Sequence, residues 1–398
     1  MNTKSTPNRS RPVLLLVVNV AWYFNLHRLA LAKAARDAGF DVHVATAPDT
    51  PQDAERIEEA GLIYHPQKVR RGRWRPLEDL RLAWTLYRLH RSIRPDIAHH
   101  ITIKPVMFGT LAARLAGTRA ILNAMSGLGF VFTAVDRRAA VRRAAVLLAY
   151  RVLFASKRLR VIFENRDDMQ LFIAKRIVKP AQATVVRGVG VDLRRFPART
   201  ETVGAPLVIL PARMLWDKGV REFCAAAATL CAEGLQARFA LVGPLDPENP
   251  AAVPETWLRD QQRGRVVEWW GHRSDMAAVY AQATIVCLPS YREGLPTVLL
   301  EAAASGCAIV TTDVPGCREV VVNGETGLLA LARDAESLTA ALRRAVSDPA
   351  LCSRLAAAAR TFVTAELSEA QMTRSTLQLY REMLPAHEMG DAIEQLSP

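Results

Sequence analysis

Residues 288–312 read LPSYREGLPTVLLEAAASGCAIVTT, and this stretch contains the unit that decides the fold. The apolar run that ends at Pro289 predicts a buried strand, and a Glu-Gly loop follows it. Pro296 is predicted to lie in the first turn of a helix, because a proline there lacks only an amide that would have no partner. The apolar run 308–312 predicts a second strand, so the stretch indicates a strand, a helix and a strand.

The same alternation continues along the whole chain and predicts an α/β protein with parallel sheets covered on both faces. Strands are expected at 12–20, 41–47, 63–65, 97–103, 120–123, 161–163 and 184–187, and then at 207–211, 238–242, 266–269, 284–288 and 308–312. Helices are expected at 27–38, 80–92, 106–115, 138–156 and 167–177 and in the tail from residue 364. We predict two Rossmann-like domains that face a cleft, residues 1–197 and 207–370, joined by a polar linker. Residues 371–398 are expected to return to the first domain as a helix.

The chain has 398 residues and a formal net charge of +13, which is unevenly distributed. Residues 1–200 carry 35 Lys and Arg against 15 Asp and Glu, whereas residues 201–398 carry 17 against 24. Residues 68–75 (KVRRGRWR) and the predicted helix within 136–160 hold much of this positive charge. Cations beside aliphatic and aromatic residues are typical of a helix on an anionic membrane surface. The alternative is a solvated helix that packs its apolar side on the sheet.

The cysteines and apolar runs favour a cytoplasmic protein, and the basic segments predict that it attaches peripherally to the inner face of the cell membrane. All six cysteines lie after residue 201 without C-x-x-C spacing, which argues against a disulfide framework or a zinc site. The apolar run 13–18 is too short for a signal sequence, and no apolar segment is long enough to span a bilayer.

The predicted helix start after Pro296 is a candidate anion site. The amides of Thr297 and Val298 have no acceptor within the helix, and the helix dipole adds to their attraction for a diphosphate. Glu293 and Glu301 bracket this point at a spacing of eight and could accept hydrogen bonds from ribose and sugar hydroxyls. Glu301 alone is explained equally well by the preference for acidic residues near a helix start.

Residues 207–220 (LVILPARMLWDKGV) place two cations, Arg213 and Lys218, between a strand end and a helix start. Arginine offers a bidentate fork to a phosphate and lysine a point charge, although a solvated loop would also carry such residues. Gly243 and Gly271 follow two further predicted strands, where a glycine alone indicates only a turn.

Together, the order and spacing of Arg213, Lys218, Gly243, Gly271 and the Glu293-x7-Glu301 segment resemble the second domain of family 4 retaining glycosyltransferases, which have the GT-B fold. The resemblance implies that Arg213 and Lys218 neutralise the donor diphosphate, that Glu301 holds the ribose and that Glu293 lies near the donor sugar. The donor site implied in this way also includes Gly243, Gly271, His272, Arg273, Gly294, Leu295, Thr297 and Val298.

The first half resembles bacterial transferases that build surface polysaccharides, through residues 19–46, residues 99–117 and the SGLG loop at 126–129. This resemblance implies an N-acetylhexosamine donor as its UDP-sugar and a lipid-linked or lipopolysaccharide acceptor. The acceptor contacts implied are Asn19, His27, Arg28, Lys104, Gly127 and Gly129.

Three positions in the first half need separate comment. Many family members have paired glycines after the first strand, where this chain has Asn-Val-Ala-Trp at 19–22. A family histidine that contacts the donor sugar corresponds to His99 or His100, and only one can reach a ligand because neighbours on a strand point to opposite faces. We assign His100. Arg28, beside His27, either binds the acceptor phosphate or is solvated.

The resemblance also implies retention at the anomeric carbon, with the UDP-sugar as co-substrate and no cofactor. No Asp-x-Asp motif stands at a predicted strand end, so we expect a metal-independent enzyme whose cations and helix start bind the diphosphate. A nucleotide-sugar epimerase on the same scaffold is one alternative. A nucleic-acid-binding protein is another, but no recognised module accompanies the basic segments, so we expect no nucleic-acid partner. A dehydrogenase would need G-x-G-x-x-G after the first strand, which is absent.

Overall fold

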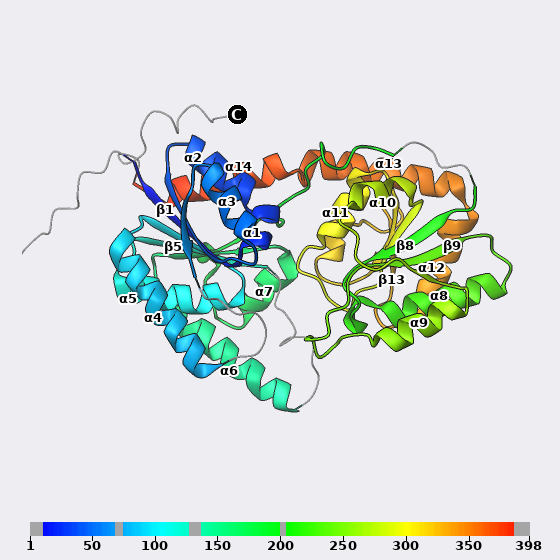
Figure 1. Cartoon of the computed structure of the whole chain (residues 1–398), viewed down its shortest axis with the longest axis horizontal. Helices are drawn as coiled ribbons and strands as arrows, with labels where there is room; N and C mark the ends of the chain where they lie inside the picture. Colours follow the sequence, from blue (N-terminus) through cyan, green and yellow to red (C-terminus); the bar gives the residue numbers. More distant parts are fainter. Residues whose placement is uncertain (1–10, 68–74, 127–136, 200–203, 386–398) are drawn as a thin grey trace, which may run out of the picture. The chain divides into compact units, whose positions relative to one another are not determined.

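The computed structural model describes residues 11–67, 75–126, 137–199 and 204–385, with the side chains of residues 137–142 left undescribed. It divides into two compact units. Unit 1 comprises Met1–Glu164, Asp168–Val189 and Thr373–Pro398, and unit 2 comprises Asn165–Asp167 and Gly190–Met372. Each unit contains one parallel sheet with helices packed on it (Figure 1).

The sheet of unit 1 has the strand order β3-β2-β1-β4-β5-β6-β7, and neighbouring strands are parallel throughout. Its strands are β1 (Val13–Val20), β2 (Asp41–Ala47), β3 (Ile63–Pro66), β4 (Ile97–Ile101), β5 (Ala120–Met125), β6 (Leu159–Phe163) and β7 (Ala183–Val185). The strand order reverses between β1 and β4, where Val17 pairs with His100. In doubly wound sheets ligands bind beyond the carboxyl ends of the strands at such a reversal.

Helices cover both faces of this sheet. They are α1 (Ala21–His27), α2 (Leu29–Asp37), α3 (Pro51–Glu59), α4 (Pro76–Ile93), η1 (Pro105–Gly109, a π-helix), α5 (Thr110–Ala116), α6 (Arg137–Leu153) and α7 (Arg166–Ala174). Leu82 and Leu86 of α4 pack on the β1 face that carries Val13 and Leu15. The C-terminal α14 (Glu369–Met383) crosses into unit 1, where Tyr380 contacts His99 of β4. The predicted return of the C-terminal helix to the first half is therefore present.

The sheet of unit 2 repeats this plan with the order β10-β9-β8-β11-β12-β13. Its strands are β8 (Leu207–Pro211), β9 (Arg238–Val242), β10 (Glu268–Trp269), β11 (Ile285–Leu288), β12 (Ala308–Thr312) and β13 (Leu328–Ala330). Its helices include η4 (Trp216–Lys218), α8 (Val220–Ala232), α9 (Glu255–Arg263), α10 (Met276–Gln282), α11 (Thr297–Ala304), η5 (Cys317–Glu319), α12 (Ala335–Ser347) and α13 (Pro349–Glu366). The reversal lies between β8 and β11, which pair through Val208 and Ile285.

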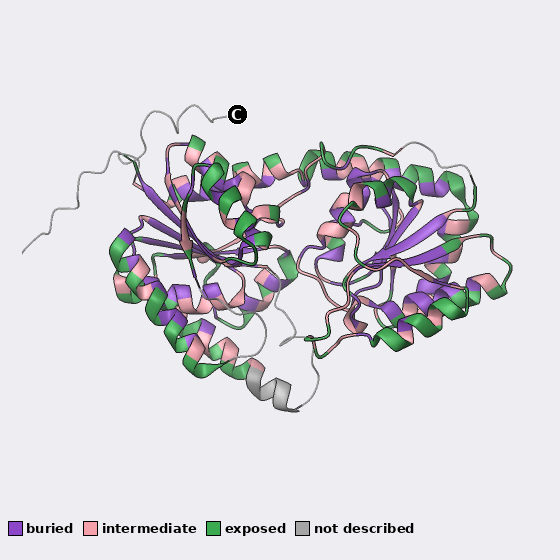
Figure 2. Cartoon of the chain, viewed as in Figure 1, coloured by how far each residue is buried: buried purple, intermediate pink, exposed green. Residues whose placement is uncertain are grey.

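Burial follows the layers: the central strands of both sheets are buried, the edge strands β3, β7 and β10 are partly exposed, and the helices expose mainly their outer sides (Figure 2). The predicted fold class, two parallel α/β sheets, is confirmed. Within the described ranges, no helix combines the length and the apolarity that a bilayer crossing requires.

Several predicted elements differ in detail from the structure. The helix expected at 27–38 is α2, which begins only at Leu29 because the backbone of Arg28 leaves helical geometry at φ −133°. The helix expected at 106–115 begins as the π-helix η1. Helices α1 and α3 and strand β13 were not predicted. Strand β13 has only three residues, and so short an apolar run does not distinguish a strand from a loop.

Candidate functional site

The candidate site in unit 2 is built from the two loops that follow β8 and β11, on either side of the strand-order reversal. The amide of Tyr291 donates to the carbonyl of Asp217 at 2.9 Å, which joins the loops. Gly219 makes a second close contact, since a Cβ on it would lie 2.2 Å from the carbonyl oxygen of Pro289. Its φ of +74° also favours glycine. The sequence therefore holds the two loops together at the place where doubly wound sheets bind ligands.

Both predicted cations lie in this site, and each contacts a carboxylate. Lys218 Nζ is 2.5 Å from Glu293 Oε1, and their side chains are only 20% and 12% exposed. Arg213 Nη1 is 2.5 Å from Asp246 Oδ2, in a more exposed pair. The structure thus brings Lys218 and Glu293 together across the two loops, as their predicted shared site requires, and adds Asp246 as a partner that the sequence did not indicate.

Asp217 was also missed, although it stands beside Lys218 in the chain. Burial raises the pKa of Asp217, and the nearby Glu293 adds to this effect, while Lys218 and Arg213 oppose it. The Oδ1 atom of Asp217 is buried without a hydrogen-bond partner within the described chain. Three carboxylates, those of Asp217, Glu293 and Asp246, and two cations therefore interact at this point, so an anionic ligand would change the balance among them.

The predicted helix start is α11, and it begins one residue later than expected. Pro296 is its N-cap with extended geometry, and Thr297 and Val298 are the first two helical residues. Their amides therefore occupy the positions that lack an acceptor within the helix. In the preceding loop, the carbonyl of Gly294 accepts a hydrogen bond from Asn165 Nδ2 at 2.9 Å, and the side chain of Leu295 is buried.

Glu301 lies on α11, partly buried, with a hydrogen-bond partner that the sequence did not reveal. The hydroxyl of Tyr280 on α10 donates to Glu301 Oε2 at 2.9 Å. Burial raises the pKa of Glu301 to about 7, although the Tyr280 hydroxyl and the charge of Arg195 favour its carboxylate form. Glu301 can therefore change its charge near neutral pH, which a helix-capping role alone would not require.

The glycines after β9 and β10 have backbone roles. A Cβ on Gly243 would lie 1.7 Å from the carbonyl oxygen of Ala212, so glycine is required here by the loop after β8. The close approach of the two loops is thus a packing reason for this glycine, separate from its predicted place in the donor site. The amide of Gly243 donates to the carbonyl of Gly271 at 2.8 Å. After Gly271, His272 is exposed and Arg273 forms an ion pair with Asp275 at 2.6 Å.

Unit 1 has a row of unpaired polar atoms along the carboxyl edge of its sheet. Five of the hydrogen-bonding oxygens that are buried without a partner in the described chain belong to Asn19, Thr46, Gln67, Thr102 and Ser126. These residues lie at or just beyond the ends of β1, β2, β3, β4 and β5, which are consecutive in the sheet. Of the five, only Asn19 was a predicted site residue. The other four are common polar residues after apolar runs, which sequence alone does not distinguish from turns.

Both candidate histidines on β4 are fully buried and engaged by neighbouring side chains. His99 Nδ1 is 2.6 Å from the hydroxyl of Tyr380, on the face covered by α14. His100 Nδ1 is 3.0 Å from Asn123 Oδ1, and its Nε2 is 3.4 Å from His90 Nε2. Burial lowers the pKa of His100 to about 3, which keeps the ring neutral. The two rings point to opposite faces as expected, and the contact of His100 with the donor sugar stays a prediction.

The remaining predicted contacts in unit 1 are divided. Arg28 is buried beside His99, so the alternative that it is solvated is wrong. His27 stacks obliquely with Tyr23 at 4.7 Å between ring centroids. Lys104 forms a largely buried ion pair with Asp79 at 2.9 Å. Gly127 and Gly129, with the segment 68–74 and the start of α6, lie outside the residues or side chains that the structure describes.

Comparison with known proteins gives matches along most of the chain. Residues 205–348 match the family model described as "Glycosyl transferases group 1". Residues 13–165 match the model described as "Glycosyl transferase 4-like". The first of these ranges contains the β8 and β11 loops and α11, and the second contains the polar carboxyl edge of unit 1.

Two curated relatives are glycosyltransferases with lipid-linked acceptors in their names. The N,N'-diacetylbacillosaminyl-diphospho-undecaprenol alpha-1,3-N-acetylgalactosaminyltransferase of Campylobacter jejuni is 29% identical over 83% of this chain and 88% of that protein. The UDP-Gal:alpha-D-GlcNAc-diphosphoundecaprenol alpha-1,3-galactosyltransferase of Escherichia coli is 28% identical over 69% of this chain and 72% of that protein.

Among solved structures, Anabaena HepE in complex with UDP and glucose matches with a TM-score of 0.75 at 16% identity. The match covers 94% of this chain and all of that one. At this identity the likeness establishes the fold, which is GT-B.

Proposed function

For this chain, which belongs to the family 4 glycosyltransferases, we propose the transfer of an N-acetylhexosamine from a UDP-sugar to a polyprenyl-diphosphate-linked or lipopolysaccharide acceptor. The reaction would serve bacterial surface glycan biosynthesis. The named activities of the relatives from C. jejuni and E. coli support this class of donor and acceptor. The observation that carries the proposal is the Lys218–Glu293 pair at the β8/β11 reversal, beside the first amides of α11.

In the proposed reaction, the bond between the anomeric carbon and the donor diphosphate breaks, and negative charge develops on the departing UDP. Lys218, Arg213 and the amides of Thr297 and Val298 would stabilise this charge. The contacts of Lys218 with Glu293 and of Arg213 with Asp246 hold both cations in place before the donor arrives.

Retention at the anomeric carbon is part of the proposal. The acceptor hydroxyl would attack from the face that the diphosphate leaves, and a phosphate oxygen of the departing UDP would take the hydroxyl proton. Glu293 would hydrogen-bond the donor sugar, and Glu301, as a carboxylate, the ribose hydroxyls. The donor site would further include Gly243, Gly271, His272, Arg273, Gly294 and Leu295.

The charge of the diphosphate is assigned to these protein groups, so the proposed enzyme needs neither a divalent metal nor a cofactor. Two cations and a helix start together supply the stabilisation that a metal ion would give. Turnover should therefore persist after exhaustive treatment with EDTA, and a loss of turnover that Mg²⁺ or Mn²⁺ restores would contradict this part.

The acceptor is assigned to unit 1. The unpaired polar atoms at the ends of β1 to β5 fit an acceptor rich in hydroxyl groups, because a ligand can supply the partners that the chain does not. Asn19, His27, Arg28, Lys104 and the glycines at 127 and 129 are the proposed contacts. The positive charge of residues 1–200 supports peripheral attachment to the anionic inner face of the cell membrane.

The test is a transfer assay in detergent with purified full-length protein. Radiolabelled UDP-N-acetylgalactosamine and UDP-N-acetylglucosamine would each be supplied with and without an undecaprenyl-diphosphate-linked sugar. We expect label in the lipid fraction only when the acceptor is present, with the α-configured linkage of the donor preserved by NMR. Conversion of the UDP-sugar to its epimer without acceptor would overturn the proposal in favour of an epimerase.

A further inference from the structure

One layer of unit 1 exposes a concentration of large apolar side chains. Helices α4, α5 and α6 lie on one face of the sheet (Figure 1). Arg114 of α5 joins this helix to the end of α6 through hydrogen bonds to the carbonyls of Val152 and Leu153. Seven of the twelve large exposed apolar side chains in the described residues belong to this layer: Leu77, Leu80, Trp84, Leu111, Leu115, Leu148 and Val152.

These side chains are not part of the core. The inner side of α4 already packs on the sheet through Leu82 and Leu86. Leu77, Leu80 and Trp84 recur at helical spacing on the other side, and the side chains of Leu80 and Trp84 are 67% and 60% exposed. A concentration of large exposed apolar side chains on one layer indicates an interaction site.

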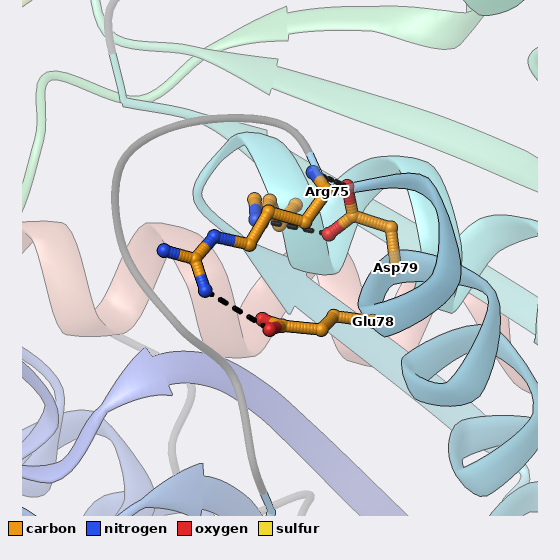
Figure 3. A network of polar contacts seen from close by, with 4 residues as sticks. Arg75, Glu78 and Asp79 are labelled. Atoms are coloured by element: carbon orange, nitrogen blue, oxygen red, sulfur yellow. Dashed lines mark hydrogen bonds and ion pairs between the residues drawn. The ribbon is translucent and has the colours of Figure 1, made fainter.

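The charge on the same helices indicates what binds there. Helices α4, α5 and α6 contain nine arginines and only two carboxylates, Glu78 and Asp79, both on α4. Glu78 pairs with the Arg75 guanidinium at 3.0 Å, and Asp79 accepts from the Arg75 amide at 2.9 Å (Figure 3). Asp79 also pairs with Lys104. The acidic groups are thus neutralised, whereas Arg81, Arg88 and Arg91 lie exposed on α4, the helix that carries Leu77, Leu80 and Trp84.

We infer that the outer surface of the α4–α5–α6 layer is the membrane-docking face of the protein, with anionic lipid as its partner. The inference rests on the proposed peripheral attachment and identifies the surface responsible, to which α4 contributes three of the seven exposed apolar side chains. Leucine and tryptophan side chains enter the boundary between headgroups and acyl chains, and flanking arginines bind the lipid phosphates. A second copy of the chain fits less well, because a two-fold contact would place arginines against arginines.

The test uses sedimentation of the full-length protein with vesicles. One set contains phosphatidylglycerol and phosphatidylcholine in equal parts, and the other contains phosphatidylcholine alone. The test variant is Leu80→Glu/Trp84→Glu, and the matched control is Val322→Glu/Leu331→Glu, which adds the same charge at exposed apolar positions of unit 2. All four positions are exposed, and thermal unfolding checks that each variant is folded.

We expect the wild type to bind the anionic vesicles far better than the neutral ones. The α4 variant should bind them at least about tenfold more weakly, and the control within about twofold of wild type. Both variants should keep wild-type transfer to a detergent-solubilised acceptor, so the docking surface is tested separately from the catalytic proposal.

Three results would overturn the inference, and they differ in what else they affect. Equal binding by the wild type and the α4 variant would remove this surface but leave membrane attachment standing. Failure of the wild type to bind anionic vesicles would remove both. If the α4 substitutions convert a dimer to a monomer in sedimentation velocity while vesicle binding is unchanged, the layer is a contact between copies instead.

Discussion

Removing the Tyr280 hydroxyl tests the role of Glu301 with a minimal change. In Tyr280→Phe the buried ring stays in place and only the donor 2.9 Å from Glu301 Oε2 is lost. A hydrogen bond to a charged group contributes about 1.5–3 kcal/mol. At 1.36 kcal/mol per pKa unit, its loss should raise the pKa of Glu301 by about one to two units. The starting value is about 7, so the variant carboxyl should titrate at about pH 8–9.

The readout is UDP affinity measured by calorimetry between pH 6 and 9. The proposed ribose contact needs the carboxylate, so wild-type affinity should fall as the pH drops through about 7. The variant should lose affinity already below about pH 8–9, which at pH 7.5 amounts to about eightfold weaker binding than wild type.

Tyr291→Phe is the matched control, because it removes a hydroxyl 2.7 Å from a different carboxylate, Glu222. It should leave the pH midpoint of UDP binding unchanged. If Tyr280→Phe binds UDP with the wild-type pH profile, Glu301 is not the titrating group and the reasoning about this contact is refuted.

Three further predictions concern stability. The raised pKa of Glu301 means that its protonated form stabilises the fold below its ordinary pKa of 4.5, and this contribution is lost as the pH rises through about 7. Glu301→Gln should therefore raise the melting temperature at pH 8 while weakening UDP binding; an unchanged melting temperature would argue against the burial effect. A Cβ on Gly243 would lie 1.7 Å from a carbonyl oxygen, so Gly243→Ala should lower the free energy of unfolding by about 2 kcal/mol or more in urea titrations. Gly264→Ala, where the nearest atom is 3.3 Å away, is the comparison and should be near neutral. Tyr380→Phe removes the partner of buried His99 at 2.6 Å and should cost about 1–3 kcal/mol by the same titration, whereas a neutral result would mean that the ring has another partner.

Most strands were predictable because they are buried on both faces and therefore appear as apolar runs. Strands 207–211, 238–242 and 308–312 were predicted with the bounds that the structure has, and so was 41–47, which also contains the polar residues Asp41, His43 and Thr46. The meeting of the loops after β8 and β11 was predictable for a related reason: Lys218 and Glu293 each follow such a run, so the topology brings them to one edge of the sheet.

What could not be predicted depends on contacts between residues distant in sequence. Tyr280 reads as an ordinary aromatic residue of a helix until its hydroxyl is placed beside Glu301. His99 and His100 differ only by which helices cover each face of β4, and local sequence does not give that. The exposure of Leu80 and Trp84 could not be predicted either, because the helical spacing of apolar residues does not show that some of them face solvent.

The central claim is that Arg213 and Lys218 form a diphosphate site, and calorimetry with UDP and with uridine tests it most directly. Arg213→Met and Lys218→Met should each weaken UDP binding by about 10- to 100-fold, the loss of a charge-assisted contact, and leave uridine binding nearly unchanged. Arg238→Met is the control, since Arg238 is as exposed as Arg213 and is likewise paired with a carboxylate, that of Glu268. Arg238 is the first residue of β9, whereas Arg213 follows the carboxyl end of β8, so Arg238 lies at the other edge of the sheet. We expect Arg238→Met to bind UDP with wild-type affinity. Equal UDP affinity in all three variants would contradict the central claim.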